Sequence, residues 1–354
     1  MNTDNSSLAG APGEPESAKR LYAELKQRIK REGLMERQSA YYLGKFTLTF
    51  GLLAVGLGFL FILDDFWLQM VNAVYMAFVF GQISLLAHDS GHRQLALRSG
   101  RMNDWLTLLL GNLLLGMSRE WWIGKHNAHH GHPNQMDTDP DIDIPLLAFE
   151  EEQAFDKRGI ARFVTKYQAF LIFPLSFLQA ISMLRRSIEF IFSKKAKRPV
   201  LEGLAILIHF MAYFGLLFYL LEPLTAILFV IVHRGLYGVY LVSVFAPNHK
   251  AMPILDKDTE VGFLHRQVLT SRNVLAHPVT DFWYGGLNYQ IEHHLFPRMP
   301  RNKLKEAQPL IQAFCKKHSI GYHETSVLRS YREILQHLHA VGAPLREANK
   351  IGLR

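Results

Sequence analysis

Four long apolar stretches interrupt an otherwise polar chain. They cover residues 46–63, 66–87, 203–221 and 223–246. The first two are separated by Asp64 and Asp65, and the last two by Glu222. Because a helix that crosses the hydrocarbon core of a bilayer needs ~20 mostly apolar residues, each pair predicts a transmembrane hairpin.

Two other apolar segments are ambiguous. Residues 105–117 are too short to span and are typical of a re-entrant or interfacial segment. Residues 167–184 are long enough, but Gln168, Pro174 and Gln179 interrupt them. If they spanned, the basic stretch 185–198, with six Lys/Arg against one Glu, would lie on the opposite side from residues 19–45, with eight against three. Both should be cytoplasmic, so the orientation rule favours four spans.

The charged and polar regions fit this topology. The net charge is +8, which first indicates cytoplasmic loops attracted to anionic lipid, and nucleic-acid binding is the weaker interpretation. The single cysteine, Cys315, excludes an intramolecular disulfide. Residues 1–18 are polar, contain no signal peptide and are expected to be disordered.

The cytosolic part is predicted to be a helical cap from residues 88–200 and 247–342. Residues 304–317 and 327–339 read as amphipathic helices, with Phe314, Leu328, Tyr331 and Leu335 as core residues. Residues 19–32 form a basic amphipathic helix, which lies either on the membrane or on the protein's own cap. The expected organisation is one domain over residues 19–342 and a C-terminal tail over residues 343–354.

Histidines cluster next to these apolar stretches. The clusters are His88-Asp-Ser-Gly-His92, His126-Asn-Ala-His129-His130 and Gln290-Ile-Glu-His293-His294, and His249 follows the fourth span. Imidazoles at i, i+3 and i+4 share one face of a helix. All-nitrogen sites suit iron, zinc, copper and nickel, and seven histidines in three clusters indicate two metals. We therefore predict an all-α integral membrane protein, whose four transmembrane helices form two hairpins and whose cap holds a histidine-ligated di-metal site.

The clusters and their setting resemble the membrane-bound fatty acid desaturases. The third cluster lies in Gly286-Leu-Asn-Tyr-Gln-Ile-Glu-His-His-Leu-Phe-Pro297, and its Gln resembles the acyl-lipid and front-end branch. Trp121-Trp122, Pro133-Asn134, the run from Asp137 to Asp141, the segment 245–250 and the segment around residues 314–318 also match. The resemblance covers residues 40–342.

The resemblance implies an O2-dependent enzyme that uses two non-haem irons and introduces a cis double bond into a long acyl chain. It implies the metal ligands His88, His92, His126, His129, His130, His249, His293 and His294. Gln290 occupies a ligand position of the pattern, where it binds through its amide oxygen, holds a water or supports a ligand. Asp89, Asn127, Asp137 and Asp139 are candidates either to accept imidazole N–H groups or to cap turns.

Other residues are candidates for the substrate pocket. They are Trp121, Trp122, Trp283, Tyr284 and Arg234; for the aromatic run 281–286, a membrane-interface belt is an equal alternative. His209 and His233 lie inside predicted spans, where ionisable groups are either functional or packed against a hydrogen-bonded partner.

The sequence departs from many front-end desaturases in one respect. About 45 residues precede the first span, without the His-Pro-Gly-Gly motif of a fused cytochrome b5 domain. We expect electrons from a separate donor such as a ferredoxin or a cytochrome b5 with its reductase, attracted by the basic surface. The other partners expected are membrane lipid and an acyl substrate carried on CoA, carrier protein or lipid. We expect a multi-pass protein of a bacterial inner membrane with the histidines facing the cytosol.

Three other functions compete with desaturation. A diiron hydroxylase of fatty acids or alkanes would use the same site. A membrane zinc metallohydrolase would use His88 and His92, but it would leave the other clusters unexplained and lacks the Glu of H-E-x-x-H. A metal transporter would bind its ion near the bilayer midplane, where only His209 and His233 lie.

Overall fold

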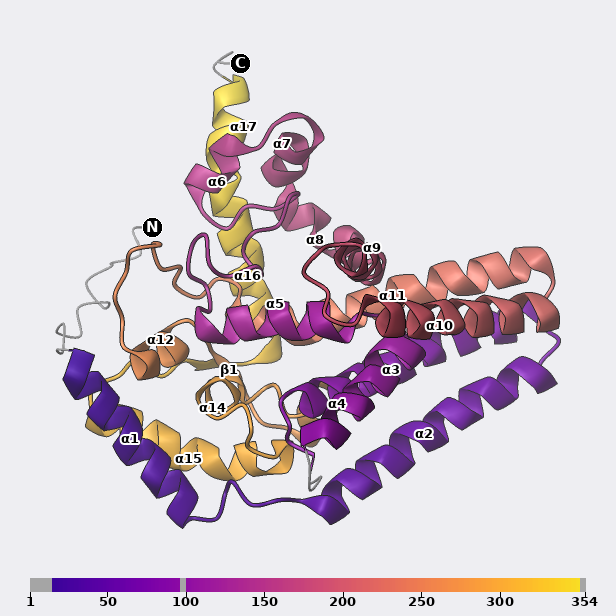
Figure 1. Ribbon diagram of the computed structural model, residues 1–354. Coiled ribbons are helices and arrows are strands. Elements are labelled where there is room, and N and C mark those ends of the chain that lie inside the picture. Colours follow the sequence, from indigo (N-terminus) through magenta and orange to yellow (C-terminus); the bar gives the residue numbers. More distant parts are fainter. Residues whose placement is uncertain (1–14, 96–99, 351–354) are drawn as a thin grey trace. The chain divides into compact units, whose positions relative to one another are not determined.

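A computed structural model describes residues 15–95 and 100–350 of the chain, which are mostly helical (Figure 1). Contacts between residues divide the chain into two compact units. Unit 1 comprises Met1–Glu36, Asn127–Leu171 and Phe245–Arg354, and unit 2 comprises Arg37–His126 and Ile172–Val244.

Unit 2 contains the long apolar helices. Its elements are α2 (Ser39–Ile62), α3 (Phe66–Gly91), α4 (Gly100–Leu108), the π-helix η2 (Leu109–Leu115), α9 (Gln179–Ile191) and α10 (Pro199–Leu220). Three further helices cross the boundary between the units: α5 (Arg119–Gly131), α8 (Gln168–Ser176) and α11 (Pro223–His249).

The prediction of four spans is confirmed. The helices α2, α3, α10 and α11 are long and apolar enough to cross a membrane. Each runs a few residues beyond its apolar stretch, so that α3 includes His88 and α11 includes His249. Asp65 between the first two spans caps α3, since its Oδ1 accepts from Leu68 N (2.9 Å). Helical backbone therefore carries these two histidines directly out of the spans.

Polar residues inside the first hairpin serve backbone groups. Gln69 Nε2 donates to Leu63 O (2.7 Å) and to Phe59 O (3.1 Å) at the end of α2. Asn72 Nδ2 donates to Gly56 O (3.1 Å). Backbone carbonyls near a helix end need hydrogen-bond donors where water is scarce. Gln69 and Asn72 supply these donors and so stabilise the hairpin of α2 and α3.

The segment at residues 105–117 forms the last part of α4 followed by η2. The π-helix ends at Gly116, whose φ of +73° suits glycine. The terminal carbonyls of η2 are bound by two polar residues of the spans: His209 Nδ1 lies 3.0 Å from Leu113 O, and Arg234 Nη1 donates to Leu115 O (3.2 Å). His209 was expected to be either functional or packed against a hydrogen-bonded partner, and its contact with Leu113 O agrees with the second alternative. Arg234 likewise binds protein groups, including His209 Nε2 at 2.6 Å.

The segment at residues 167–184 is not one straight helix. It breaks between α8 and α9, which meet at 69°. Pro174 lies inside α8, where it lacks the N–H that continues the helix. The described residues contain four spans, or five if this bent pair crosses as one.

Unit 1 is built from short helices. They are α1 (Pro15–Arg31), α6 (Glu151–Asp156), α7 (Gly159–Lys166), α12 (Phe263–Leu269), α13 (Pro278–Trp283), α14 (Gln290–Leu295), α15 (Arg301–Lys317), α16 (Val327–Val341) and α17 (Ala343–Lys350). Two two-residue strands, β1 (Asn273–Val274) and β2 (Glu324–Thr325), pair in parallel. The expected cap helices at residues 304–317 and 327–339 are present as α15 and α16.

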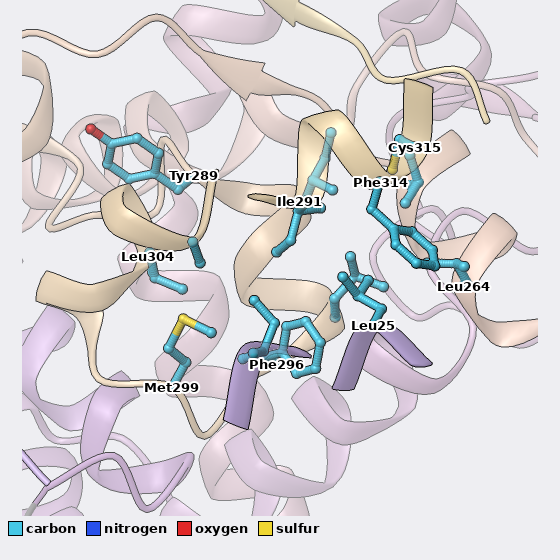
Figure 2. Close-up of a cluster of buried hydrophobic side chains, with 14 of the residues drawn as sticks. Leu25, Leu264, Tyr289, Ile291, Phe296, Met299, Leu304, Phe314 and Cys315 are labelled. Carbon is cyan, nitrogen blue, oxygen red and sulfur yellow. The ribbon is translucent and has the colours of Figure 1, made fainter. Parts of the chain in front are cut away.

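The core of unit 1 decides where α1 lies. Leu25 and Ile29 are completely buried in a cluster with α12, α14 and α15 (Figure 2). Tyr22 stacks on Phe296 and donates from its hydroxyl to Leu295 O (2.9 Å). Of the two alternatives for this amphipathic helix, packing on the protein's own cap is therefore the one observed.

Two details of the C-terminal region differ from expectation. Phe314 is buried as expected, but Leu328 is 82% exposed, so its assignment to the core was wrong. The periodicity did place Leu328 on a helix, but in the first turn of α16, beside solvent. Residues 343–350, expected in a tail, form α17, and Leu345 is buried against Ala148, Ala154 and Val341.

The position of α1 gives a first prediction. Leu25→Ala should lower the free energy of unfolding by ~2–5 kcal/mol, because it leaves a cavity in a packed core. The exposed Gln27→Ala is the matched control and should change it little. The measurement is the denaturation midpoint of both variants in detergent. A helix lying on the membrane would give the opposite pattern, with weaker membrane binding and unchanged stability.

Candidate metal centre

In unit 2, one turn of helix brings the first two histidines together. His88 and His92 lie four residues apart at the end of α3, with ring centroids 4.6 Å apart. His126 on α5 joins them, with its centroid 5.0 Å from His88 and its Nε2 2.8 Å from His92 Nε2. One ring nitrogen from each of the three lies within 4.8 Å of the others. Three imidazoles thus converge on one point.

Trp122 closes this cluster on one side. Its ring stacks on His126, with centroids 4.6 Å apart and planes at 19°, and it also meets His88 edge-on. A Cβ at Gly91 would lie 2.4 Å from the Trp122 ring, so only glycine admits this approach. Trp122 therefore shields imidazoles and orients His126.

In unit 1, a second cluster consists of His129, His249 and His294. They come from α5, the end of α11 and α14, and all three are buried. One ring nitrogen of each lies within 4.8 Å of the others, and the Nε2 atoms of His129 and His249 are 3.3 Å apart.

The tautomer of each of these three histidines is fixed by an acceptor. His129 Nδ1 lies 3.0 Å from the Asp139 carboxylate, His249 Nδ1 lies 3.1 Å from Thr270 O, and His294 Nδ1 lies 2.8 Å from Gln267 Oε1. Gln267 Nε2 donates to His130 O (2.9 Å), which sets the direction of its amide. Because carbonyl and carboxylate oxygens only accept, each Nδ1 carries the proton.

These tautomers make the cluster a good fit for a metal ion. Each Nε2 then presents a lone pair, and two of these lone pairs face each other at 3.3 Å inside a buried site. Two facing lone pairs repel each other; a cation between them would remove this repulsion, and the Gln290 amide N–H, 2.8 Å from His249 Nε2, reduces it in part. A ligating histidine also donates its other ring N–H to a carboxylate, carbonyl or amide, as found here. The donor set is all imidazole, which suits iron.

His130 and His293 lie beside this cluster within unit 1. Their ring centroids are 4.9 Å apart, and His130 stacks on His294 with centroids 4.2 Å apart. Gln290 is also close: its Nε2 is 2.8 Å from His249 Nε2, and its Oε1 accepts from Asn248 Nδ2 (3.2 Å). Gln290 is thus in contact with a histidine of the cluster, at the position that the sequence pattern indicates.

Of the four Asp and Asn residues that are candidates to accept imidazole N–H groups, two are buried beside a histidine and two are exposed. Asp139 is buried and holds His129, and Asp89 is buried with its Oδ1 3.4 Å from His88 Nδ1. Asp137 is exposed and pairs with Lys257 at 3.5 Å. Asn127 is exposed.

The candidate pocket residues lie in several places. Trp122 packs on the histidines of unit 2, and Trp121 is partly buried on α5. Trp283 is 38% exposed, whereas Tyr284 is buried. Arg234 binds the end of η2 as described above.

Several residues that support the site escaped the sequence analysis. Glu292 is fully buried and accepts from Asn273 Nδ2 (2.6 Å) and the Tyr322 hydroxyl (2.8 Å). Asn273 Oδ1 also accepts from Ile291 N (2.9 Å). Burial raises the pKa of Glu292 to about 7. The only signal for Glu292 was its place between Gln290 and His293; Gln267 and Asn273 gave none.

The start of α5 is held by buried side chains of unit 2. Ser118 Oγ accepts from Trp121 N (3.2 Å) and itself bonds to the Glu202 carboxylate. Glu202 Oε1 also accepts from Glu120 N (3.0 Å). A carboxylate at a helix N-terminus satisfies its free N–H groups and its dipole. Glu202 thereby fixes the helix that bears His126.

Comparison with known proteins agrees with this geometry. Residues 65–326 match the family described as fatty acid desaturase. The chain is 30% identical over 337 residues to an acyl-lipid (9-3)-desaturase of Physcomitrium patens, covering 92% of this chain and 63% of that protein. It is 31% identical over 334 residues to the delta(6)-fatty-acid desaturase fat-3 of Caenorhabditis elegans, covering 90% and 74%. The chain belongs to the fatty acid desaturase family, and it spans less than two thirds of the moss relative.

The hydrogen bond from His129 gives a second prediction. Asp139→Asn should weaken iron binding ~10- to 100-fold, because the amide supports the histidine tautomer less firmly than the carboxylate does. Asp137→Asn, two residues away and exposed, is the matched control and should bind iron as the wild type does. Iron titration of purified protein measures both. Equal affinities would mean that the Asp139 contact does not tune the ligand.

Proposed function

We propose that this chain is an O2-dependent fatty acyl desaturase that introduces a cis double bond into a long acyl chain. The observation that carries the proposal is the convergence of His129, His249 and His294 with their tautomers fixed by Asp139, Thr270 and Gln267. Membership of the fatty acid desaturase family supports it.

Two irons would be held by eight histidines. They are His88, His92, His126, His129, His130, His249, His293 and His294. When bound, the irons would supply the O2 activation needed to take one hydrogen from each of two neighbouring methylenes. Two external electrons and two protons complete the reduction of O2 to two waters. Helix α5 carries two of these histidines, His126 in unit 2 and His129 in unit 1.

The chain's own residues orient the histidine rings and bury them. Asp139, Thr270 and Gln267 hold ring protons at Nδ1 and so leave each Nε2 without a proton. The three imidazoles are at most 5% exposed, which keeps bulk water away from these rings. Gln290 Nε2 lies 2.8 Å from His249 Nε2, which supports a role for this amide in holding that imidazole. Desaturation at one pair of carbons then requires a fixed acyl position relative to these groups.

The partners and location follow from the same proposal. Electrons come from a separate donor such as a ferredoxin or a cytochrome b5. The substrate is a long-chain acyl group on CoA, carrier protein or lipid. Four helices are long and apolar enough to cross a membrane, which supports an integral membrane protein. The basic stretches flanking them support histidines on the cytosolic side, and we propose the bacterial inner membrane.

A third prediction tests the reaction. Cells that lack a matching desaturase and express this chain under air should accumulate new cis-unsaturated acids, and His129→Ala should abolish them by removing a ligand. The control is His132→Ala, since this exposed residue bonds Gln135 and lies outside the clusters. Fatty acid analysis gives both the product and the double-bond position.

The same experiment separates the alternatives. Hydroxylated acids would assign a hydroxylase that uses this site. The purified wild type should contain two irons per chain, and a protein with neither iron nor product would overturn the proposal.

A further inference from the structure

Unit 2 contains a cavity away from the histidines. Its volume is about 230 Å³, and it lies among α4, the first residue of α5 and the start of α10. Three arginines line it, Arg101, Arg119 and Arg198, together with Trp105. Nothing in the mechanism above uses this cavity.

The carboxylates of the cavity are already engaged. Asp104 Oδ1 accepts from Arg119 Nη2 (2.6 Å). The Glu202 carboxylate, only 2% exposed, binds Ser118 Oγ and Glu120 N at the start of α5. Neither acid is therefore available to neutralise further positive charge.

The positive groups are in excess. Arg101 and Arg198 form no ion pair with any carboxylate in residues 15–95 and 100–350. Arg119 Nε is buried and has no hydrogen-bond partner within the same ranges. Arg198 also occupies the N-cap of the 22-residue helix α10, whose N-terminal end carries partial positive charge. Planar guanidinium groups in such a setting suit phosphate oxygens.

One side of the cavity is apolar. Leu108 lines it, and Trp105 does so while remaining 56% exposed, as is usual for tryptophan at a membrane interface. The volume of about 230 Å³ is below the ~300–1,000 Å³ of pockets that enclose a whole ligand. The cavity is thus suited to the charged head of an amphiphile whose chain lies elsewhere.

We propose that this cavity binds a phosphate ester in the head of the acyl substrate, through Arg101 and Arg198. The inference rests on the proposed function, because it names what that substrate carries. Arg119 and His126 are seven residues apart on α5, hence ~10 Å along the helix axis. A head group held there lies at a set distance from the histidines of unit 2 and helps to fix which carbons react.

Phosphate esters occur in each acyl carrier proposed above: in a glycerophospholipid, and in the phosphopantetheine arm that coenzyme A shares with carrier protein. The test therefore uses three probes: dioleoylphosphatidylcholine, oleoyl-CoA and free oleate, which lacks phosphate. Binding is measured on the full, iron-loaded chain in a non-ionic detergent under argon, with no electron donor, so that no turnover occurs. The readout is intrinsic tryptophan fluorescence, with Trp105→Phe to identify the local signal.

Arg101→Ala and Arg198→Ala should each weaken binding of one phosphate probe by about 10- to 100-fold, the usual effect of losing a charge-assisted hydrogen bond. Oleate binding should not change, and Arg198→Lys should restore part of the affinity. Arg185→Ala is the matched control, because Arg185 is exposed and pairs with Glu189 on α9. In turnover, the two variants should raise KM with little change in kcat.

The outcomes separate the carriers and the two proposals. A loss confined to phosphatidylcholine assigns a lipid-borne substrate, and a loss confined to oleoyl-CoA assigns a CoA thioester. If neither arginine changes the affinity of either phosphate probe, the inference is overturned, even when cells still make unsaturated acids. If the binding pattern holds but cells make no product, the proposed function fails and the phosphate site stands.

Discussion

The structure depends on hydrogen bonds that fix the protons of buried imidazoles. An imidazole can bind metal only through a nitrogen that carries no proton, and burial makes any misplaced proton costly. Asp139, Thr270 and Gln267 each bind one Nδ1, which directs three Nε2 lone pairs to one point. These acceptors come from a loop, the residue after α12 and α12 itself. Much of unit 1 can be understood as the scaffold that brings α12, α14 and the end of α11 together.

The need of buried polar groups for hydrogen-bond partners also explains why polar residues lie inside the spans. Gln69, Asn72, His209 and Arg234 all bind backbone carbonyls of the hairpin or of η2. Without water, carbonyls at helix ends must be satisfied by side chains. Glu202 instead accepts a hydrogen bond from a backbone N–H group at the start of α5. Gln69 and Asn72 therefore support the first hairpin, whereas His209 and Arg234 support the end of η2.

Helix α1 shows how packing decides between equal alternatives. Its spacing of Leu21, Leu25 and Ile29 fits a membrane surface and a protein core equally well. Leu25 and Ile29 are buried against α14, the helix of the third histidine cluster, and Tyr22 binds Leu295 O. The N-terminal helix is thus part of the support of the metal centre. Leu328 is the opposite case, because its helical phase was clear but its helix leaves that position in solvent.

The sequence by itself determined the four apolar spans and the histidine clusters, because length, hydropathy and spacings of three or four residues are local properties. It also indicated the desaturase family, since the clusters lie in a recognisable setting. Only the tertiary structure decided which acceptor each imidazole uses: Asp139 and Asp137 are two residues apart, yet one is buried against His129 and the other is exposed. Gln267, Asn273 and Glu202 lie 27, 19 and 84 residues along the chain from the residues they bind, His294, Glu292 and Ser118. Contacts of that kind leave no periodic trace in a single sequence, because they depend on how distant segments pack.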